Sequence, residues 1–219
     1  MTLDLDLARR NMVSNQVRTW EVLDPRVLDV LGSVRRELFV RPDLEGMAYA
    51  DLELPIGHGE IMMKPVLEGR LLQALALEGG EHVLEIGTGS GYLTACLAQL
   101  AARVTSVDIH ADFTGSAMAR LRGLGIDNCE LLTAEALHGF MPAEPFDAIA
   151  VTGAVARLPQ HWTGWLKPGG RLFVVQGRAP VMQALLLRQG AAEPERIEPL
   201  FETDLPYLRH AAPQTQFVL

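Results

Sequence analysis

The segment from residue 85 to residue 91 holds residue types that could bind a ligand. Gly87, Gly89 and Gly91 stand where a short apolar run ends and a helical pattern begins. Glycines at such a turn let the backbone bend sharply and approach a ligand closely. Asp108 follows about 20 residues after Gly87, near the spacing at which an acid accepts hydrogen bonds from ribose hydroxyls. Together these features predict a site for a ligand that contains a ribose.

The letters of the turn narrow the type of ligand. The dinucleotide fingerprint GxGxxG would need a glycine where this chain has Tyr92. The segment reads ExGxGxG instead and resembles the first motif of the class I S-adenosylmethionine-dependent methyltransferases. This resemblance implies S-adenosyl-L-methionine as cofactor and S-adenosyl-L-homocysteine as product. The residues expected to bind the cofactor are Glu85, Gly87, Thr88, Gly89, Gly91, Asp108, Ile109, Ala134 and Glu135.

Two acids in this set, Glu85 and Glu135, are supported by different arguments. Glu85 ends an apolar run, and a carboxylate there is costly to bury without a partner, such as the cofactor's ammonium or a backbone N–H. Ala134 and Glu135 follow the third expected strand. In this superfamily the loop there meets adenine through a backbone N–H and an acid. The alternative for Glu135 is a solvated surface glutamate.

Alternating apolar runs and helical patterns position these residues. Strands alternating with helices predict a parallel sheet with right-handed crossovers. The expected strands cover residues 82–87, 103–109, 128–134, 145–155 and 170–177, with helices at 92–102 and 110–125. Two later runs, at 182–188 and 196–202, leave no room for a crossover helix, so they predict an antiparallel pair.

The N-terminal part reads as helical to about residue 45, with Asp24 and Pro25 as a helix start. Residues 52–65 hold two glycines and two prolines and read as a loop before another helix. The expected fold is a three-layer α/β Rossmann-like methyltransferase fold with a mostly parallel sheet, an antiparallel C-terminal strand pair and a helical N-terminal extension. We expect one domain over residues 1–219, divided into 1–60, 61–177 and 178–219.

Composition excludes several classes of function. The formal charge is −8, without a basic stripe, which disfavours nucleic acid as a partner. The apolar stretches fall short of the roughly 18 residues of a membrane span, and the N-terminus lacks the pattern of a secretory signal. Cys96 and Cys129 are expected as free thiols, and the 6 histidines show no ligand spacing, so no metal is expected. These features predict a cytoplasmic protein, monomeric or a small homo-oligomer.

Several further segments narrow the resemblance to one family. They are NMV at 11–13, DPRVL at 24–28, RELFV at 36–40, AYAD at 48–51, LPIGHG at 54–59, FDAI at 146–149 and LKPGGRL at 166–172. In order and spacing, from about residue 11 to about residue 177, they look like the protein-L-isoaspartate O-methyltransferase family. The resemblance implies a peptide or protein partner whose isoaspartyl α-carboxylate accepts the methyl group.

Such an acceptor makes few demands on side chains. A carboxylate with a reference pKa near 4 is ionised at neutral pH, so its attack needs no general base. Alignment and exclusion of water would supply the rate. Thr152, at the end of the fourth expected strand, is the one candidate catalytic residue, although a strand-end threonine is more often structural.

The chain departs from the family in the loop that should meet the acceptor. Family members generally read GQTISxP, whereas this chain has Glu60, Ile61, Met62 and Met63 in place of QTIS. A methionine cannot donate a hydrogen bond to an anion, and such a lost bond costs about 1.5 to 3 kcal/mol. The residues expected to bind the acceptor are Ile56, Gly57, His58, Gly59, Met62 and Met63.

Three functions are therefore open. The first is an isoaspartyl methyltransferase that holds the acceptor through Thr152 or backbone amides. The second is a related methyltransferase with a less polar acceptor, such as a small molecule. The third is a cofactor-binding protein without turnover. The tail from residue 202 also departs from the family and is a candidate to shape the acceptor pocket.

Overall fold

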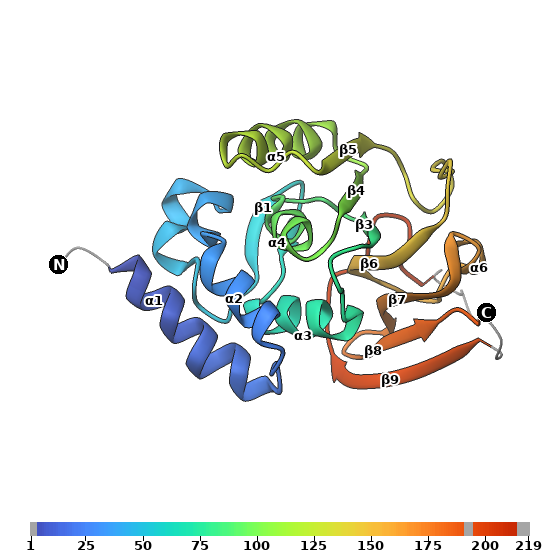
Figure 1. Cartoon of the computed structure of the whole chain (residues 1–219), viewed down its shortest axis with the longest axis horizontal. Helices are drawn as coiled ribbons and strands as arrows, with labels where there is room; N and C mark the ends of the chain where they lie inside the picture. Colours follow the sequence, from blue (N-terminus) through green and yellow to red (C-terminus); the bar gives the residue numbers. More distant parts are fainter. Residues whose placement is uncertain (1–3, 191–194, 214–219) are drawn as a thin grey trace, which may run out of the picture.

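A seven-stranded sheet forms the centre of the molecule (Figure 1). The structure is a computed structural model that describes residues 4–190 and 195–213. The strand order is β5-β4-β3-β6-β7-β8-β9. The strands are β3 (His82–Ile86), β4 (Arg103–Asp108), β5 (Cys129–Thr133), β6 (Phe146–Val155), β7 (Leu166–Arg178), β8 (Val181–Arg188) and β9 (Arg196–Thr203).

The first five strands of this sheet pair in parallel, and β8 runs antiparallel to both of its neighbours. The mostly parallel Rossmann-like sheet with an antiparallel C-terminal strand pair is thus confirmed. The strand expected at residues 170–177 begins earlier in the structure, because β7 also includes residues 166–169.

Helices cover both faces of the sheet, because successive apolar side chains of its strands point to opposite faces. On β3, Val83 belongs to the cluster under α3 (Pro65–Leu75) and α4 (Tyr92–Leu100), whereas Leu84 belongs to a second cluster with Trp162. Leu121 of α5 (Ala111–Gly123) joins the first cluster, and Trp162 lies in the short α6 (Gln160–Thr163). The central strands β3, β4 and β6 are therefore buried on both faces, as strands of a parallel sheet usually are.

The N-terminal extension is helical, as expected. It contains α1 (Leu5–Asn11), a π-helical turn, α2 (Pro25–Ser33) and short 3-10 segments. Asp24 caps α2 by accepting a hydrogen bond of 2.9 Å from the Arg26 amide. None of the helices in residues 4–190 and 195–213 combines the length and apolar character that crossing a bilayer requires.

One apolar cluster joins the three segments into which we divide the chain. It contains Met12 of the first segment, Leu97 of the second and Leu205 of the third, all essentially buried. The cluster links the segments through a shared core. The division at residues 60 and 177 stays a prediction.

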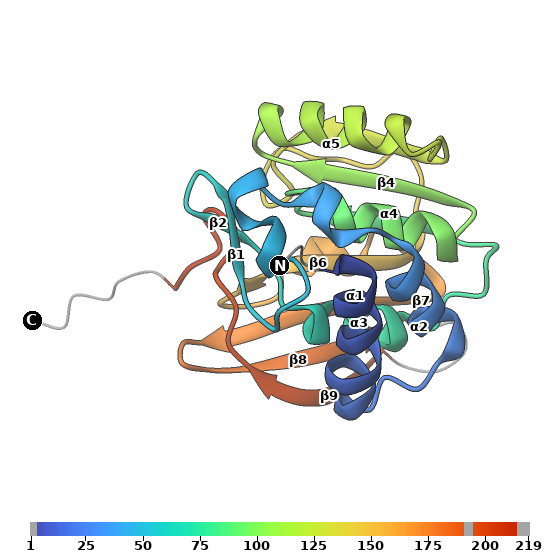
Figure 2. The same ribbon diagram turned by 90° about the vertical axis from the view of Figure 1, so that its left-hand side faces the viewer.

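Residues 52–65 correct the sequence-based expectation of a loop. They form an antiparallel hairpin of β1 (Leu54–Gly57) and β2 (Glu60–Met62). Glycine and proline signal a turn, but the tight turn at His58 and Gly59, with φ of 53° and 79°, lets the flanking residues pair. Figure 2 shows this hairpin beside the tail that follows β9.

Candidate cofactor and acceptor site

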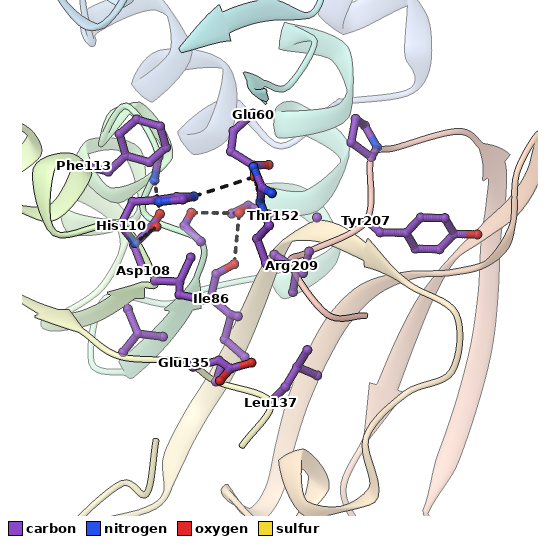
Figure 3. A pocket seen from close by; sticks show the side chains of 18 of the residues that line it. Glu60, Ile86, Asp108, His110, Phe113, Glu135, Leu137, Thr152, Tyr207 and Arg209 are labelled. Atoms are coloured by element: carbon purple, nitrogen blue, oxygen red, sulfur yellow. Dashed lines mark hydrogen bonds and ion pairs between the residues drawn. The ribbon is translucent and has the colours of Figure 1, made fainter. Parts of the chain in front are cut away.

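A cavity opens at the carboxyl ends of β3, β4 and β6 (Figure 3). It holds about 740 Å³ of space that no atom fills, including the part open to solvent. Ligands of open α/β sheets bind at this edge. The lining residues come from the glycine turn, the ends of β4 and β6, the segment after β5, the β1–β2 hairpin and the tail after β9.

The glycine turn is held against the end of β4. Asp108 is 7 % exposed. Its carboxylate accepts hydrogen bonds from the amides of Gly89, at 2.8 Å, and of His110, at 2.9 Å. Gly87, Gly89, Asp108 and Ile109 all line the cavity. The carboxylate that we expect to bind ribose is therefore fixed by backbone donors at the rim of the turn.

The other two residues of the turn lie elsewhere. The hydroxyl of Thr88 is buried and bonds that of Ser106 at 2.6 Å. Thr88 lines a smaller neighbouring cavity. Gly91 precedes α4 with φ of 85° and lines neither cavity. Their expected contribution to cofactor binding stays a prediction, and the structure places both where they shape the turn.

The segment after β5 forms another wall of the cavity. The amide of Ala134 donates to the carbonyl of Asp108 at 2.9 Å, so the expected contact of a backbone N–H with adenine would need another amide of this segment. Glu135 lines the cavity, and one of its oxygens lies 2.6 Å from Nδ1 of His210 in the tail. The acid expected to meet the adenine amine is thus tied to a residue from the end of the described chain.

Glu85 lies below the turn and is completely buried. One oxygen accepts hydrogen bonds of 2.5 Å from the hydroxyls of Thr94 and Ser106. The other oxygen has no hydrogen-bond partner among the described residues. Burial raises the pKa of Glu85 to about 8. Hydroxyls therefore partner this acid, rather than the backbone N–H that the sequence suggested, and the carboxyl is largely protonated at neutral pH.

The hairpin places His58 at the outer rim. Its ring stacks on that of His110, with centroids 4.1 Å apart and planes 9° apart. Its Nε2 lies 2.9 Å from a carboxylate oxygen of Asp112. In residues 4–190 and 195–213 these three residues are the one grouping with ligand atoms spaced for a metal ion. Parallel stacked rings direct their lone pairs along separate planes, so they do not meet at one ion.

Met62 and Met63 point inward from the end of the hairpin. Each is 4 % exposed, and both line the smaller cavity. The carbonyl of Met63 accepts a hydrogen bond of 2.5 Å from Arg36, which is completely buried. Arg36 also pairs with the buried Glu68 and lies over the ring of Tyr92, 4.7 Å from its centre. A buried cation thus fixes the position of the methionines.

Three residues that we expected to bind the acceptor, Ile56, Gly57 and Gly59, differ in whether they line the cavities. Ile56 lines both cavities, whereas Gly57 and Gly59 lie at the exposed turn and line neither. The Gly57 position faces Phe113, and the Gly59 position faces Arg209. Their expected contact with the acceptor stays a prediction.

Thr152 lies at the floor, where the two cavities meet. Its hydroxyl donates toward the carbonyls of Ile86, at 3.0 Å, and Gly87, at 2.8 Å. A hydroxyl has one proton to donate, and here that proton supports the glycine turn. The candidate catalytic residue is therefore placed near the site but has its donor already in use.

Glu60 and Arg209 form a bridge that the sequence did not suggest. Nε of Arg209 lies 2.6 Å from a carboxylate oxygen of Glu60, and Arg209 also donates to the carbonyl of His58. Nε2 of His110 lies 3.8 Å from the same carboxylate. Two features of the sequence could have pointed to this bridge, namely the acid Glu60 in place of the family's glutamine and a tail that departs from the family. Neither identified the partner.

Comparisons with known proteins agree with this geometry. The family model described as Protein-L-isoaspartate(D-aspartate) O-methyltransferase (PCMT) matches residues 8–198. A protein-L-isoaspartate O-methyltransferase of Anaeromyxobacter dehalogenans (strain 2CP-C) is 42 % identical over 194 residues, covering 88 % of this chain and 93 % of the relative. One of Methylorubrum populi is 39 % identical over 193 residues, covering 88 % and 90 %.

A solved structure shows the same fold. It is a Plasmodium falciparum protein described as a protein-L-isoaspartate O-methyltransferase in complex with S-adenosyl-L-homocysteine, with a TM-score of 0.76 and 19 % identity. The match covers 91 % of this chain and 97 % of that one. The family model and the relatives show that the chain belongs to the protein-L-isoaspartate(D-aspartate) O-methyltransferase family.

Proposed function

We propose that this protein transfers the methyl group of S-adenosylmethionine to the α-carboxylate of L-isoaspartyl residues in damaged proteins. The observation that carries this proposal is the cavity in which the glycine turn, Asp108 and the β1–β2 hairpin meet. The relatives that are about 40 % identical over most of the chain carry the name of this activity. We further propose a role in protein repair in the cytoplasm, where the free thiols of Cys96 and Cys129 would stay reduced.

The residues at the turn fit this cofactor. A Cβ atom at Gly89 would lie 3.0 Å from Cδ1 of Ile56, so glycine keeps the cradle open. The unpartnered oxygen of Glu85 offers a buried polar group below the turn. We assign Asp108 to the ribose hydroxyls, Glu135 to the adenine side and Glu85 to the amino-acid end. The bound cofactor supplies a methyl group on a positively charged sulfur.

The chemistry requires alignment rather than proton transfer. A carboxylate oxygen of the acceptor forms the bond to the methyl carbon while the bond from that carbon to sulfur breaks, leaving a methyl ester and a neutral thioether. The acceptor is ionised at neutral pH, so no side chain has to remove a proton. Ile56, Ile61 and Leu208 line the cavity and exclude water from the nucleophile.

A less polar acceptor is the second candidate function. The observation in its favour is the apolar character of the hairpin, where Ile61 lines the larger cavity and the buried Met62 and Met63 line the smaller one. The larger cavity also contains Arg209 and Glu60, which favour a charged acceptor over an apolar one. Because this cavity is open, a role without turnover has less support.

Mass spectrometry of a synthetic isoaspartyl peptide tests the proposed function. We expect the peptide to gain one methyl group when it is incubated with the protein and S-adenosylmethionine. The matched peptide with a normal aspartyl residue is the control and should gain none. Absence of methylation in a preparation that binds the cofactor, as measured by calorimetry, would contradict the proposal.

A further inference from the structure

The hairpin lacks the hydroxyl donors that the acceptor carboxylate would be expected to meet. Ile61 and Met63 replace the hydroxyl residues of the hairpin, and neither side chain can donate a hydrogen bond. Thr152 directs its proton toward the carbonyls of Ile86 and Gly87. Neither the hairpin nor Thr152 therefore offers a free hydroxyl to an anionic acceptor.

The tail after β9 is fixed at the end of β6. The amide of Ala154 donates to the carbonyl of Pro206 at 2.8 Å, and the amide of Leu208 donates to the carbonyl of Ala154 at 2.9 Å. Leu208 packs so closely that a Cβ atom at Gly153 would lie 2.8 Å from it. Arg209 follows directly, and Figure 3 shows its side chain reaching across the cavity toward Glu60. A defined backbone thus delivers this guanidinium to the strand end.

The charges around the cavity make Arg209 distinct. Glu60, Asp108 and Glu135 contribute carboxyl groups to the lining. Among the lining residues in the described part of the chain, Arg209 is the one lysine or arginine. A guanidinium carries more N–H donors than the bonds to Glu60 and the His58 carbonyl use. Arg209 can therefore receive a further carboxylate in a paired arrangement.

We propose that Arg209 binds the α-carboxylate of the acceptor and replaces the loop hydroxyl in this role. Glu60 holds the guanidinium in place while the acceptor is absent and shares it when the acceptor enters. Methylation removes the negative charge, so the ester product loses this interaction and leaves more easily. This inference rests on the proposed function, because it names the group that recognises the isoaspartyl carboxylate.

The proposal places the effect of Arg209 on binding rather than on the chemical step. A positive charge beside the nucleophilic oxygen stabilises the bound acceptor and does not make it more reactive. We expect Arg209→Met to raise KM for the isoaspartyl peptide about 10- to 100-fold, the range for a lost bond to a charged group. The kcat should stay within a few-fold, and Arg209→Lys should recover part of the loss by keeping the charge.

The decisive experiment compares two ligands in complexes with S-adenosyl-L-homocysteine, in which no turnover occurs. One is the isoaspartyl peptide, and the other is the same peptide with its α-carboxylate replaced by a carboxamide. Calorimetry should show that the wild type prefers the carboxylate by about 10- to 100-fold. Arg209→Met should lose most of this preference. Arg122→Met is the matched control, because Arg122 is exposed on α5 and lines neither cavity.

Glu60→Gln gives a second test in the opposite direction. It removes the carboxylate that pairs with the guanidinium of Arg209, so the isoaspartyl peptide should bind this variant a few-fold more tightly than it binds the wild type. An unchanged preference for the carboxylate in Arg209→Met, with the fold intact, would overturn this inference alone. A wild-type protein that methylates no isoaspartyl peptide would overturn the proposed function and this inference together.

Discussion

The part of the cavity that we assign to the cofactor, the cofactor side, and the part that we assign to the acceptor, the acceptor side, are built in different ways. On the cofactor side, backbone amides and one carboxylate do the positioning, as in the bond between Gly89 and Asp108, which are 19 residues apart. On the acceptor side, long side chains from distant segments meet, as in the bridge between Arg209 and Glu60, which are 149 residues apart. Backbone geometry leaves a local sequence pattern, whereas a bridge between distant side chains does not.

The largest expected effect comes from the buried Arg36, which anchors the hairpin of the acceptor side to the core. Arg36→Met would leave Glu68 buried without its cation and free the carbonyl of Met63. We expect the free energy of unfolding to fall by about 3 to 5 kcal/mol, as when one partner of a buried ion pair is removed. Denaturant unfolding measures this change.

A double variant sharpens this test. Arg36→Met combined with Glu68→Leu removes both charges, so it should recover much of the stability lost in the single variant. If the single variant lost less than about 1 kcal/mol, the hairpin would not depend on this pair. The acceptor side would then be held mainly by its surface contacts.

The next effect concerns the glycine turn of the cofactor side. Gly87 has φ of 97°, and an added Cβ atom would overlap the hydroxyl of Thr152. Gly87→Ala should cost roughly 1 to 3 kcal/mol of stability through backbone strain and weaken cofactor binding, which calorimetry would measure. The control is Gly115→Ala on α5, where no atom lies within 4 Å and a gain of about 0.5 to 1 kcal/mol is expected. Equal changes in stability and in cofactor affinity for the two variants would show that the backbone of the glycine turn does not determine the cofactor side.

Per pH unit, the smallest effect is the pH dependence set by Glu85. The folded protein keeps this proton up to about pH 8, whereas the unfolded chain releases it near 4.5. Between these values unfolding releases a proton, so the contribution of Glu85 to stability is present at low pH and is lost as pH rises. The stability of wild type relative to Glu85→Gln should fall by roughly 1 kcal/mol per pH unit in this window.

Unfolding curves of both proteins from pH 5 to pH 8 measure this difference. The substitution keeps an acceptor for the hydroxyls of Thr94 and Ser106, so the comparison isolates the titration. A difference that stays constant with pH would mean that Glu85 is ionised throughout the range. In that case the unpartnered oxygen of Glu85 would accept a hydrogen bond in the protein without cofactor.

The sequence predicted the cofactor side of the cavity better than the acceptor side. The strands, the glycine turn and Asp108 could be predicted because periodicity and spacing report local backbone geometry. The prediction of a loop at residues 52–65 was wrong, because glycine and proline indicate a turn but do not show whether the residues on either side of it will pair as strands. Arg209 and His210 could not be found, since their partners depend on the path of the tail across the sheet.

The roles of individual residues illustrate the remaining limit. Met63 was recognised as unusual by its type, but its burial and its carbonyl bond to Arg36 depend on tertiary packing. Thr152 was recognised as a hydroxyl at a strand end, but the direction of its proton is set by carbonyls of another strand. The type of a side chain was thus readable where its orientation was not.

The distance along the chain between Glu60 and Arg209 has a consequence for synthesis. Chains emerge from the ribosome N-terminus first, and their early parts begin to fold before the end is made. The turn and Asp108 can come together while the tail is still being translated. The bridge from Arg209 to Glu60 has to wait until 149 further residues have followed Glu60. With the role that we propose for Arg209, recognition of the acceptor would therefore be acquired later in synthesis than the geometry of the turn.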